Sequence, residues 1–187
     1  MKKYLSKWYL YLLAISISVV GFCLAVTIKT NPSKLEKVNF FLSTYDALVN
    51  DIDKELETKS DKDIKQINIT FSFYGSSSFA YVYETTRQEM DFYILPLSFV
   101  KQNETISLHF QTLNESYLNE YFEAEQTYLH LADESKGIKV YDHLSKEGYF
   151  KDYVTYDNGD SNEDFYLFFN YKSQNLGNIN EGKTDHA

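Results

Sequence analysis

The residues whose types and spacing most clearly suit ligand binding are Gly75-Ser76-Ser77-Ser78. They follow an alternating apolar stretch and precede a helical pattern. A strand that leads into a helix N-terminus presents unpaired N–H groups and a positive dipole end, which suit a carboxylate or phosphate. Serine hydroxyls add donors, but ordinary helix capping explains the same residue types. Glycines at Walker spacing are missing, so a nucleotide loop is excluded. The loop predicts either an anion-binding turn or a capped helix.

Polar residues also follow the other strands that the sequence predicts. In a parallel α/β sheet, ligands gather beyond the carboxyl ends of the strands. Segments 43–46, 76–78 and 96–98 are therefore expected on one rim, and the polar residues after the last apolar strand are expected to join them. The predicted ligand-binding residues are Ser43, Thr44, Tyr45, Ser76, Ser77, Ser78, Ser98, Asn170, Lys172 and Ser173.

Metal binding and catalysis find little support in the spacing of residues. The four histidines, His109, His130, His143 and His186, show no close metal-ligand spacing. The acidic run 157–164 lacks the glycine and glutamate positions of an EF-hand loop and predicts a solvated hairpin turn. G-x-S-x-G, a complete S-x-x-K set and a catalytic cysteine are also missing. We therefore predict no metal, no cofactor and no enzymatic activity, with an envelope hydrolase as the weakest alternative.

The hydrophobic pattern predicts an α/β fold, with a mostly parallel or mixed sheet and flanking helices. Strands are expected at 37–42, 64–74, 91–95, 106–110, 137–141, around Val154 and Tyr156, and at 165–169, the last being fully apolar and central. Helices are expected through Leu48, Ile52 and Leu56, from Phe79 to Arg87, and over 115–131. The order strand, helix, strand, helix, strand in the first half is typical of parallel α/β units.

Composition limits the class of protein. The 187 residues leave room for one domain, and 43% hydrophobic content is too high for a disordered chain. Three of the 18 basic residues (Lys2, Lys3 and Lys7) precede the hydrophobic segment, which leaves 15 against 27 acidic residues, or −12, for the rest. Such a charge repels phosphate backbones, so nucleic-acid binding is not expected. Arg87 is the only arginine, a bias typical of AT-rich bacterial genomes.

The N-terminus predicts a membrane anchor. Residues 8–28 form 21 consecutive positions without a charge, enough to cross the bilayer. Lysines on the N-terminal side predict that this end is cytoplasmic and that the C-terminal domain is extracellular. Cleavage of a signal peptide after Ala25 and lipidation of Cys23, the only cysteine, are the alternatives. The expected organisation is a basic end (1–7), a transmembrane signal anchor (8–28), a linker (29–36), an extracytoplasmic domain (37–174) and a flexible tail (175–187).

Three stretches together resemble extracytoplasmic solute-binding proteins of ABC transporters. They are Val38-Asn39-Phe40-Phe41-Leu42; Ser76 to Tyr81 followed by Asp91 to Ser98; and Gly137 to Asp142 with Tyr166 to Ser173. The resemblance implies a periplasmic-binding-like lobe, with Asn170, Lys172 and Ser173 near its end. The chain departs from the family in lacking a lipobox and in being too short for two lobes. It implies a membrane-anchored binding domain that captures a small solute or assists an ABC transporter permease. The alternative is a cell-envelope protein-interaction module with no small ligand.

Overall fold

The computed structural model describes residues 33, 36–43, 52, 64–122, 125–151, 162–173 and 175. The chain divides into two compact units, residues 1–33 and 34–187, and apart from Ser33 the described residues belong to the second. The membrane anchor predicted over 8–28 lies outside the described residues. Within the described part, no helix combines the length and the apolar character needed to cross a membrane.

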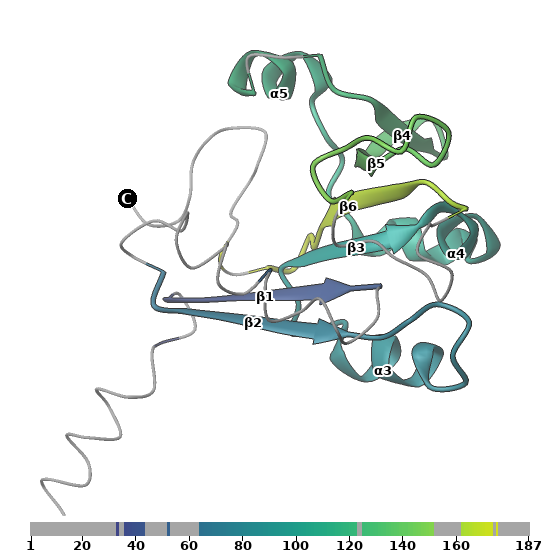
Figure 1. Ribbon diagram of the computed structural model, residues 1–187. Helices are drawn as coiled ribbons and strands as arrows, with labels where there is room; N and C mark the ends of the chain where they lie inside the picture. Colours follow the sequence, from purple (N-terminus) through teal and green to yellow (C-terminus); the bar gives the residue numbers. More distant parts are fainter. Residues whose placement is uncertain are drawn as a thin grey trace, which may run out of the picture. The chain divides into compact units, whose positions relative to one another are not determined.

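The second unit contains a six-stranded mixed sheet in the order β2-β1-β3-β6-β5-β4 (Figure 1). β1 pairs in parallel with both β2 and β3, whereas the pairs β3–β6, β6–β5 and β5–β4 are antiparallel. The predicted α/β class with a mixed sheet is confirmed. The strands are β1 (Lys37–Leu42), β2 (Gln66–Phe71), β3 (Phe92–Pro96), β4 (Tyr128–Leu131), β5 (Glu134–Tyr141) and β6 (Phe165–Phe169).

Helical elements pack on both faces of the sheet. They are α3 (Phe79–Thr86), α4 (Leu97–Gln102), the 3-10 helix η3 (Glu104–His109) and α5 (Glu115–Tyr121). Alternate residues of a strand point to opposite faces, so Phe41 and Tyr93 pack with α3, α4 and η3 on one face. On the other face Phe169 packs with Leu118 of α5, and Leu42 with Ile52. The sheet is therefore covered on both faces, and its core lies in two layers, one on each face.

The central position predicted for the last apolar strand is confirmed. β6 lies between β3 and β5, and four of its five residues are buried. A strand with neighbours on both sides and covered faces needs no polar alternation. Pro96 ends β3 as expected and immediately precedes α4.

The strand predicted over 106–110 is wrong, because most of this segment forms η3. Ile106 and Phe110 are buried while Leu108 is 72% exposed. In a strand all three side chains would share one face. Burial of residues four apart instead follows a helical turn.

The helix predicted over 115–131 is wrong in its second half. α5 ends at Tyr121, and β4 begins at Tyr128. Asn119 Oδ1 accepts the backbone N–H of Gln126 at 2.9 Å and the Tyr128 hydroxyl at 2.9 Å, which holds the returning chain against the helix. β4 then joins β5 through a two-residue turn, Ala132 and Asp133, both with positive φ. Such turns favour Asn-Gly, so the sequence carries no strong hairpin signal here.

Two further predictions lie outside the described residues. The strand around Val154 and Tyr156 falls in the undescribed range 152–161. Of the helix predicted after β1, only Ile52 is described; it is helical and 3% exposed.

Candidate functional site

Two of the predicted rim residues lie at the carboxyl ends of β1 and β3. Ser43 directly follows β1, and its N–H donates to the Ile94 carbonyl at 3.0 Å. Ser98 lies in the first turn of α4, just after β3. Both hydroxyls are buried and have no hydrogen-bond partner among the described residues. Because β1 and β3 are parallel, the two serines are on the same edge of the sheet. Thr44 and Tyr45 lie outside the described residues.

The serine loop leads from β2 into α3, as expected. Its first residue, Gly75, has a φ of +108°, a value that favours glycine. Ser78 occupies the N-cap position, but its side chain makes no capping hydrogen bond. The hydroxyl oxygens of Ser76 and Ser78 are 3.3 Å apart, and Ser77 is exposed. Side-chain capping, one of the two alternatives for this loop, is therefore not formed.

Asn170, Lys172 and Ser173 do not join this rim. β6 runs antiparallel to β3, with Phe169 opposite Phe92. The residues that follow β6 therefore meet Asp91 at the amino end of β3, at the opposite edge of the sheet. The expectation of one convergent rim is corrected for these three residues, because it assumed that β6 was parallel.

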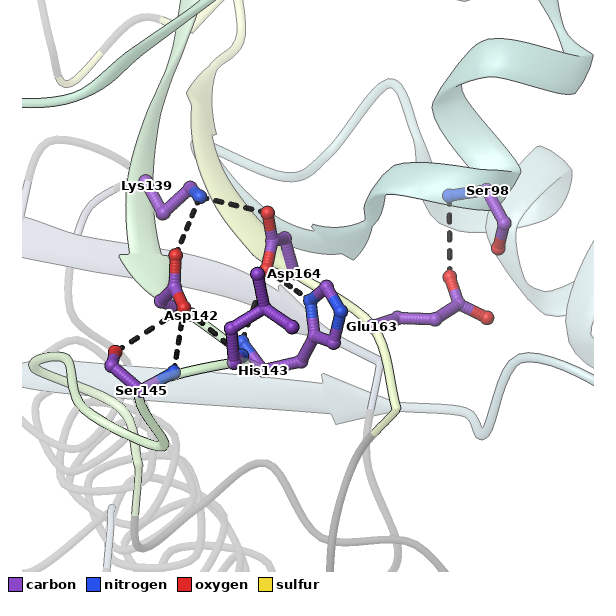
Figure 2. Close-up of polar contacts among 8 residues, drawn as sticks. Ser98, Lys139, Asp142, His143, Ser145, Glu163 and Asp164 are labelled. Carbon is purple, nitrogen blue, oxygen red and sulfur yellow. Dashed lines mark hydrogen bonds and ion pairs between the residues drawn. The ribbon is translucent and has the colours of Figure 1, made fainter.

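Sequence reasoning missed an ion-pair cluster near the carboxyl ends of β3 and β5. Lys139 Nζ lies 2.8 Å from Asp142 Oδ2 and 2.7 Å from Asp164 Oδ2 (Figure 2). His143 Nδ1 lies 2.7 Å from Asp164 Oδ1, which also accepts the His143 backbone N–H. The cluster joins the end of β5 to the start of β6. Its only sequence signal was one lysine and two aspartates at strand ends, which is too common a pattern to predict a contact.

The charges of this cluster stabilise one another. Burial by itself lowers the pKa of Lys139, but hydrogen bonds to Asp142 and Asp164 outweigh it and raise that pKa above its ordinary value. The hydrogen bond from Lys139, followed by those from Ser145, lowers the pKa of Asp142. Burial by itself raises the pKa of Asp164, but its hydrogen bonds from Lys139 and His143 outweigh burial and lower it.

The cluster has part of the geometry of acid–base catalysis. A carboxylate that holds Nδ1 leaves Nε2 of the imidazole to act on a proton, as in a hydrolase triad. Among the described residues, however, no hydroxyl is hydrogen-bonded to Nε2 of His143. The contact of Ser98 with this region is through its backbone, whose N–H donates to Glu163 Oε2 at 3.2 Å (Figure 2). The cluster is best explained as a clamp between β5 and β6.

A second histidine also lies beside a serine and a carboxylate. His130 Nε2 is 3.1 Å from Ser135 Oγ and 2.9 Å from Glu115 Oε1, and the Ser135 hydroxyl also donates to Glu115. A triad needs the acid on Nδ1 and the nucleophile on Nε2. Here both partners bind the same nitrogen, so these three residues do not have triad geometry.

A cavity of about 320 Å³ lies at the amino ends of β1 and β3. Two of the predicted ligand residues, Lys172 and Ser173, line it, together with Lys37, Asn39, Gln88, Glu89, Met90, Asp91 and Asn175. Charged groups of both signs and neutral amides thus share one wall. Lys172 Nζ also lies 5.3 Å from the centre of the Tyr171 ring, within the range of a cation–π contact.

Asp91 organises the wall of this cavity. It is 3% exposed, and its carboxylate accepts the Asn39 backbone N–H at 2.8 Å, the Ser173 hydroxyl at 2.5 Å and the Asn175 amide at 2.9 Å. These bonds tie β1 and the segment after β6 to the start of β3. Sequence reasoning assigned Asp91 to a strand and missed this role, because the partners are 52 to 84 residues away.

Asn170 holds the same segment from its buried side. Its side-chain amide donates to the Met90 carbonyl at 2.6 Å and to the Arg87 carbonyl at 3.2 Å, and its oxygen accepts the Lys172 N–H at 3.0 Å. At 3% exposure, this residue supports the cavity without lining it. Of the three predicted residues after β6, Lys172 and Ser173 reach the cavity and Asn170 positions them.

Charged and neutral polar side chains meet at this edge of the sheet. Lys172 and Glu89 line the cavity with side chains of opposite charge, while the Asp91 carboxylate already accepts three hydrogen bonds. Among the described residues, no group of three or more histidine, cysteine, aspartate or glutamate side chains has the geometry to hold a metal ion.

Comparison with known proteins finds no matching family model, no matching curated protein and no matching solved structure.

Proposed function

We propose that the chain is a membrane-anchored, extracytoplasmic binding domain that captures a small polar solute at the Asp91 cavity. In this proposal it acts as a reduced solute-binding protein or as an accessory to an ABC transporter permease. The observation that carries the proposal is the cavity of about 320 Å³ lined by Lys172 and Ser173. This volume falls within the range of small-molecule sites.

The charges of the cavity favour a zwitterionic solute such as an amino acid or a short peptide. Lys172 offers an ammonium group to a carboxylate, and Glu89 offers a carboxylate to an ammonium group. Asn39, Gln88 and Asn175 add neutral amides. Fixed groups of both signs discriminate against purely anionic or purely cationic solutes, because one of the two sets would then repel the ligand.

The membrane and family parts of the proposal rest on the sequence. The uncharged segment 8–28 and its N-terminal lysines support an anchor with the domain outside the cell. The parallel strands β2, β1 and β3 with flanking helices are compatible with a periplasmic-binding-like lobe. Protease treatment of intact cells tests the topology, since an outward-facing domain is digested and a cytoplasmic one is protected.

Thermal shift of the full-length chain in detergent tests solute capture. The screen contains amino acids, dipeptides, sugars and inorganic oxyanions. A solute at about 100 times its Kd adds roughly 2.7 kcal/mol, which corresponds to several degrees. The shift should disappear in Lys172→Gln and persist in Lys101→Gln, a matched change of an exposed lysine on α4. A flat screen on a folded sample contradicts solute capture.

A protein-interaction module without a small ligand is the second candidate, and the aromatic residues of α5 favour it. Tyr121 is 68% and Phe122 is 43% exposed. Their rings pack edge to face at 5.3 Å, and Tyr117 stacks on Tyr121 at 6.3 Å. Aromatic residues are enriched at protein interfaces. Crosslinking in intact envelopes tests this candidate, since a captured partner should be lost in Tyr121→Ser and retained in Tyr81→Ser.

A further inference from the structure

A second, smaller cavity of about 100 Å³ lies on the face of the sheet that α3, α4 and η3 cover. Tyr83 and Glu84 line it from α3, Arg87 lines it from the position that follows α3, and His109 lines it from η3. None of the residues that line it belongs to the Asp91 cavity. Its chemistry is therefore separate from the proposed solute site.

The hydrogen bonds of Arg87 fix the state of His109. Arg87 Nη1 lies 2.7 Å from His109 Nε2. A guanidinium can only donate, so Nε2 must be the acceptor and the imidazole is neutral with its proton on Nδ1. Burial, followed by the charge of Arg87, lowers the pKa of His109, which agrees with this assignment. Both residues line the cavity, Arg87 as a guanidinium and His109 as a neutral imidazole.

Tyr83 adds a donor that the protein leaves unused. The residue is 3% exposed, and its hydroxyl has no hydrogen-bond partner among the described residues. Burial raises the pKa of Tyr83 well above its ordinary value, so the hydroxyl stays protonated. A buried polar group without a partner costs free energy. The hydroxyl is not accessible from the cavity in this structure, so an acceptor atom there would remove this cost once the Tyr83 ring shifts toward it.

We propose that this cavity binds the carboxylate group of a small organic acid between Tyr83, Arg87 and His109. A carboxylate is an acceptor-only group, and arginine binds it with good geometry. The volume equals that of about three water molecules, which admits a carboxylate and a short substituent. The carboxylate belongs either to a free small acid or to the carboxyl terminus of a peptide.

Glu84 is the internal competitor for this site. Its Oε2 lies 3.0 Å from Arg87 Nε, but its side chain is 57% exposed. An exposed pair of this kind contributes little to stability, so an incoming carboxylate can displace it. Removing the charge of Glu84 should therefore strengthen binding, whereas a purely structural role of the pair predicts no such gain.

Titration of the isotopically labelled full-length chain in detergent with sodium acetate, followed by NMR, tests the proposal. We expect saturable shifts at the amides of α3 and η3, which sodium chloride at equal ionic strength and acetamide do not produce. Tyr83→Phe should weaken acetate binding about fivefold, the loss of one ordinary hydrogen bond. Arg87→Gln should weaken it by about tenfold or more, because its bonds are charge-assisted. Glu84→Gln should strengthen it, and Tyr81→Phe on the exposed side of α3 should leave it unchanged.

Three results would overturn the proposal. Equal shifts with chloride would mean that the cavity holds water and nonspecific ions only, and equal affinity for acetamide would exclude a carboxylate site. Unchanged binding in both Tyr83→Phe and Glu84→Gln would remove the site from this cavity, even where Arg87→Gln does not fold. Glycylglycine that competes with acetate, while its C-terminal amide does not, assigns the carboxylate to a peptide terminus. Acetate binding without such competition assigns it to a free acid.

Discussion

Replacing Asp91 with alanine should destabilise the domain more than any other change at the larger cavity. Three donors, the Asn39 N–H, the Ser173 hydroxyl and the Asn175 amide, would lose their acceptor. A hydrogen bond to a charged group contributes about 1.5–3 kcal/mol. Because the adjoining cavity lets water reach part of the network, we take the low end and expect a loss of about 4–5 kcal/mol for the three bonds. That is a large part of the roughly 5–15 kcal/mol that holds a typical domain folded.

Urea unfolding of the full-length chain in detergent, followed by near-UV circular dichroism, measures this loss. With a typical dependence of about 1–3 kcal/mol per molar urea, the midpoint should fall by about 2 M. Asp91→Asn keeps the shape of the side chain and one acceptor oxygen, so its midpoint should lie between those of the parent and Asp91→Ala. Glu89 lines the same cavity but is exposed. The free energy of unfolding of Glu89→Ala should therefore stay within about 0.5 kcal/mol of the parent. Equal midpoints for Asp91→Ala and Glu89→Ala would refute the role given to Asp91.

Three other changes test the packing and electrostatics of the fold. Gly137→Ala places a Cβ 2.6 Å from the buried Phe168 ring, and we expect a loss of about 1–3 kcal/mol in urea unfolding. Burial raises the pKa of Tyr83, so its contribution to stability is complete below about pH 10. This contribution is lost as pH rises further, because the unfolded chain ionises first. Tm measured from pH 9 to 12 should therefore fall less steeply in Tyr83→Phe. The lowered pKa of Asp142 has the opposite sign: its contribution is complete above about pH 4 and is lost as pH falls, so Lys139→Met should flatten the decline of Tm in acid.

The strands that could be predicted from the sequence are those whose surroundings match a simple pattern. β1 and β3 combine apolar residues with clear boundaries, and β6 is apolar throughout because it is covered on both faces. The errors arose where tertiary contacts decided the structure. The segment around Ile106 contains alternating apolar residues, yet Ile106 and Phe110 are buried in the core and Leu108 is exposed. The turn at Ala132 and Asp133 adopts positive φ without the glycine or asparagine that would announce it.

The candidate sites were predicted to different extents for a related physical reason. Their position after the last apolar strand identified Lys172 and Ser173 as ligand candidates, and both line the larger cavity. The direction of β6 decides which edge they reach, and an apolar strand carries no sign of its direction. Pairing between distant residues was equally invisible. The contact of Arg87 with His109 spans 22 positions, and nothing in either segment indicates the other.

In the proposed function, one lobe holds the solute without the closure of a second lobe, so its binding groups have to be positioned before the solute arrives. Asp91 performs this task by fixing Asn39, Ser173 and Asn175 on the cavity wall, whereas Lys172 is exposed and contributes a charge without supporting the fold. Measuring solute affinity and stability together should therefore distinguish the roles of Lys172 and Asp91. Lys172→Gln should lower solute affinity at unchanged stability, and Asp91→Asn should lower both, because disordering the wall raises the entropic cost of binding. Loss of stability without loss of affinity in Asp91→Asn would show that the network serves only the fold and that solute is held elsewhere.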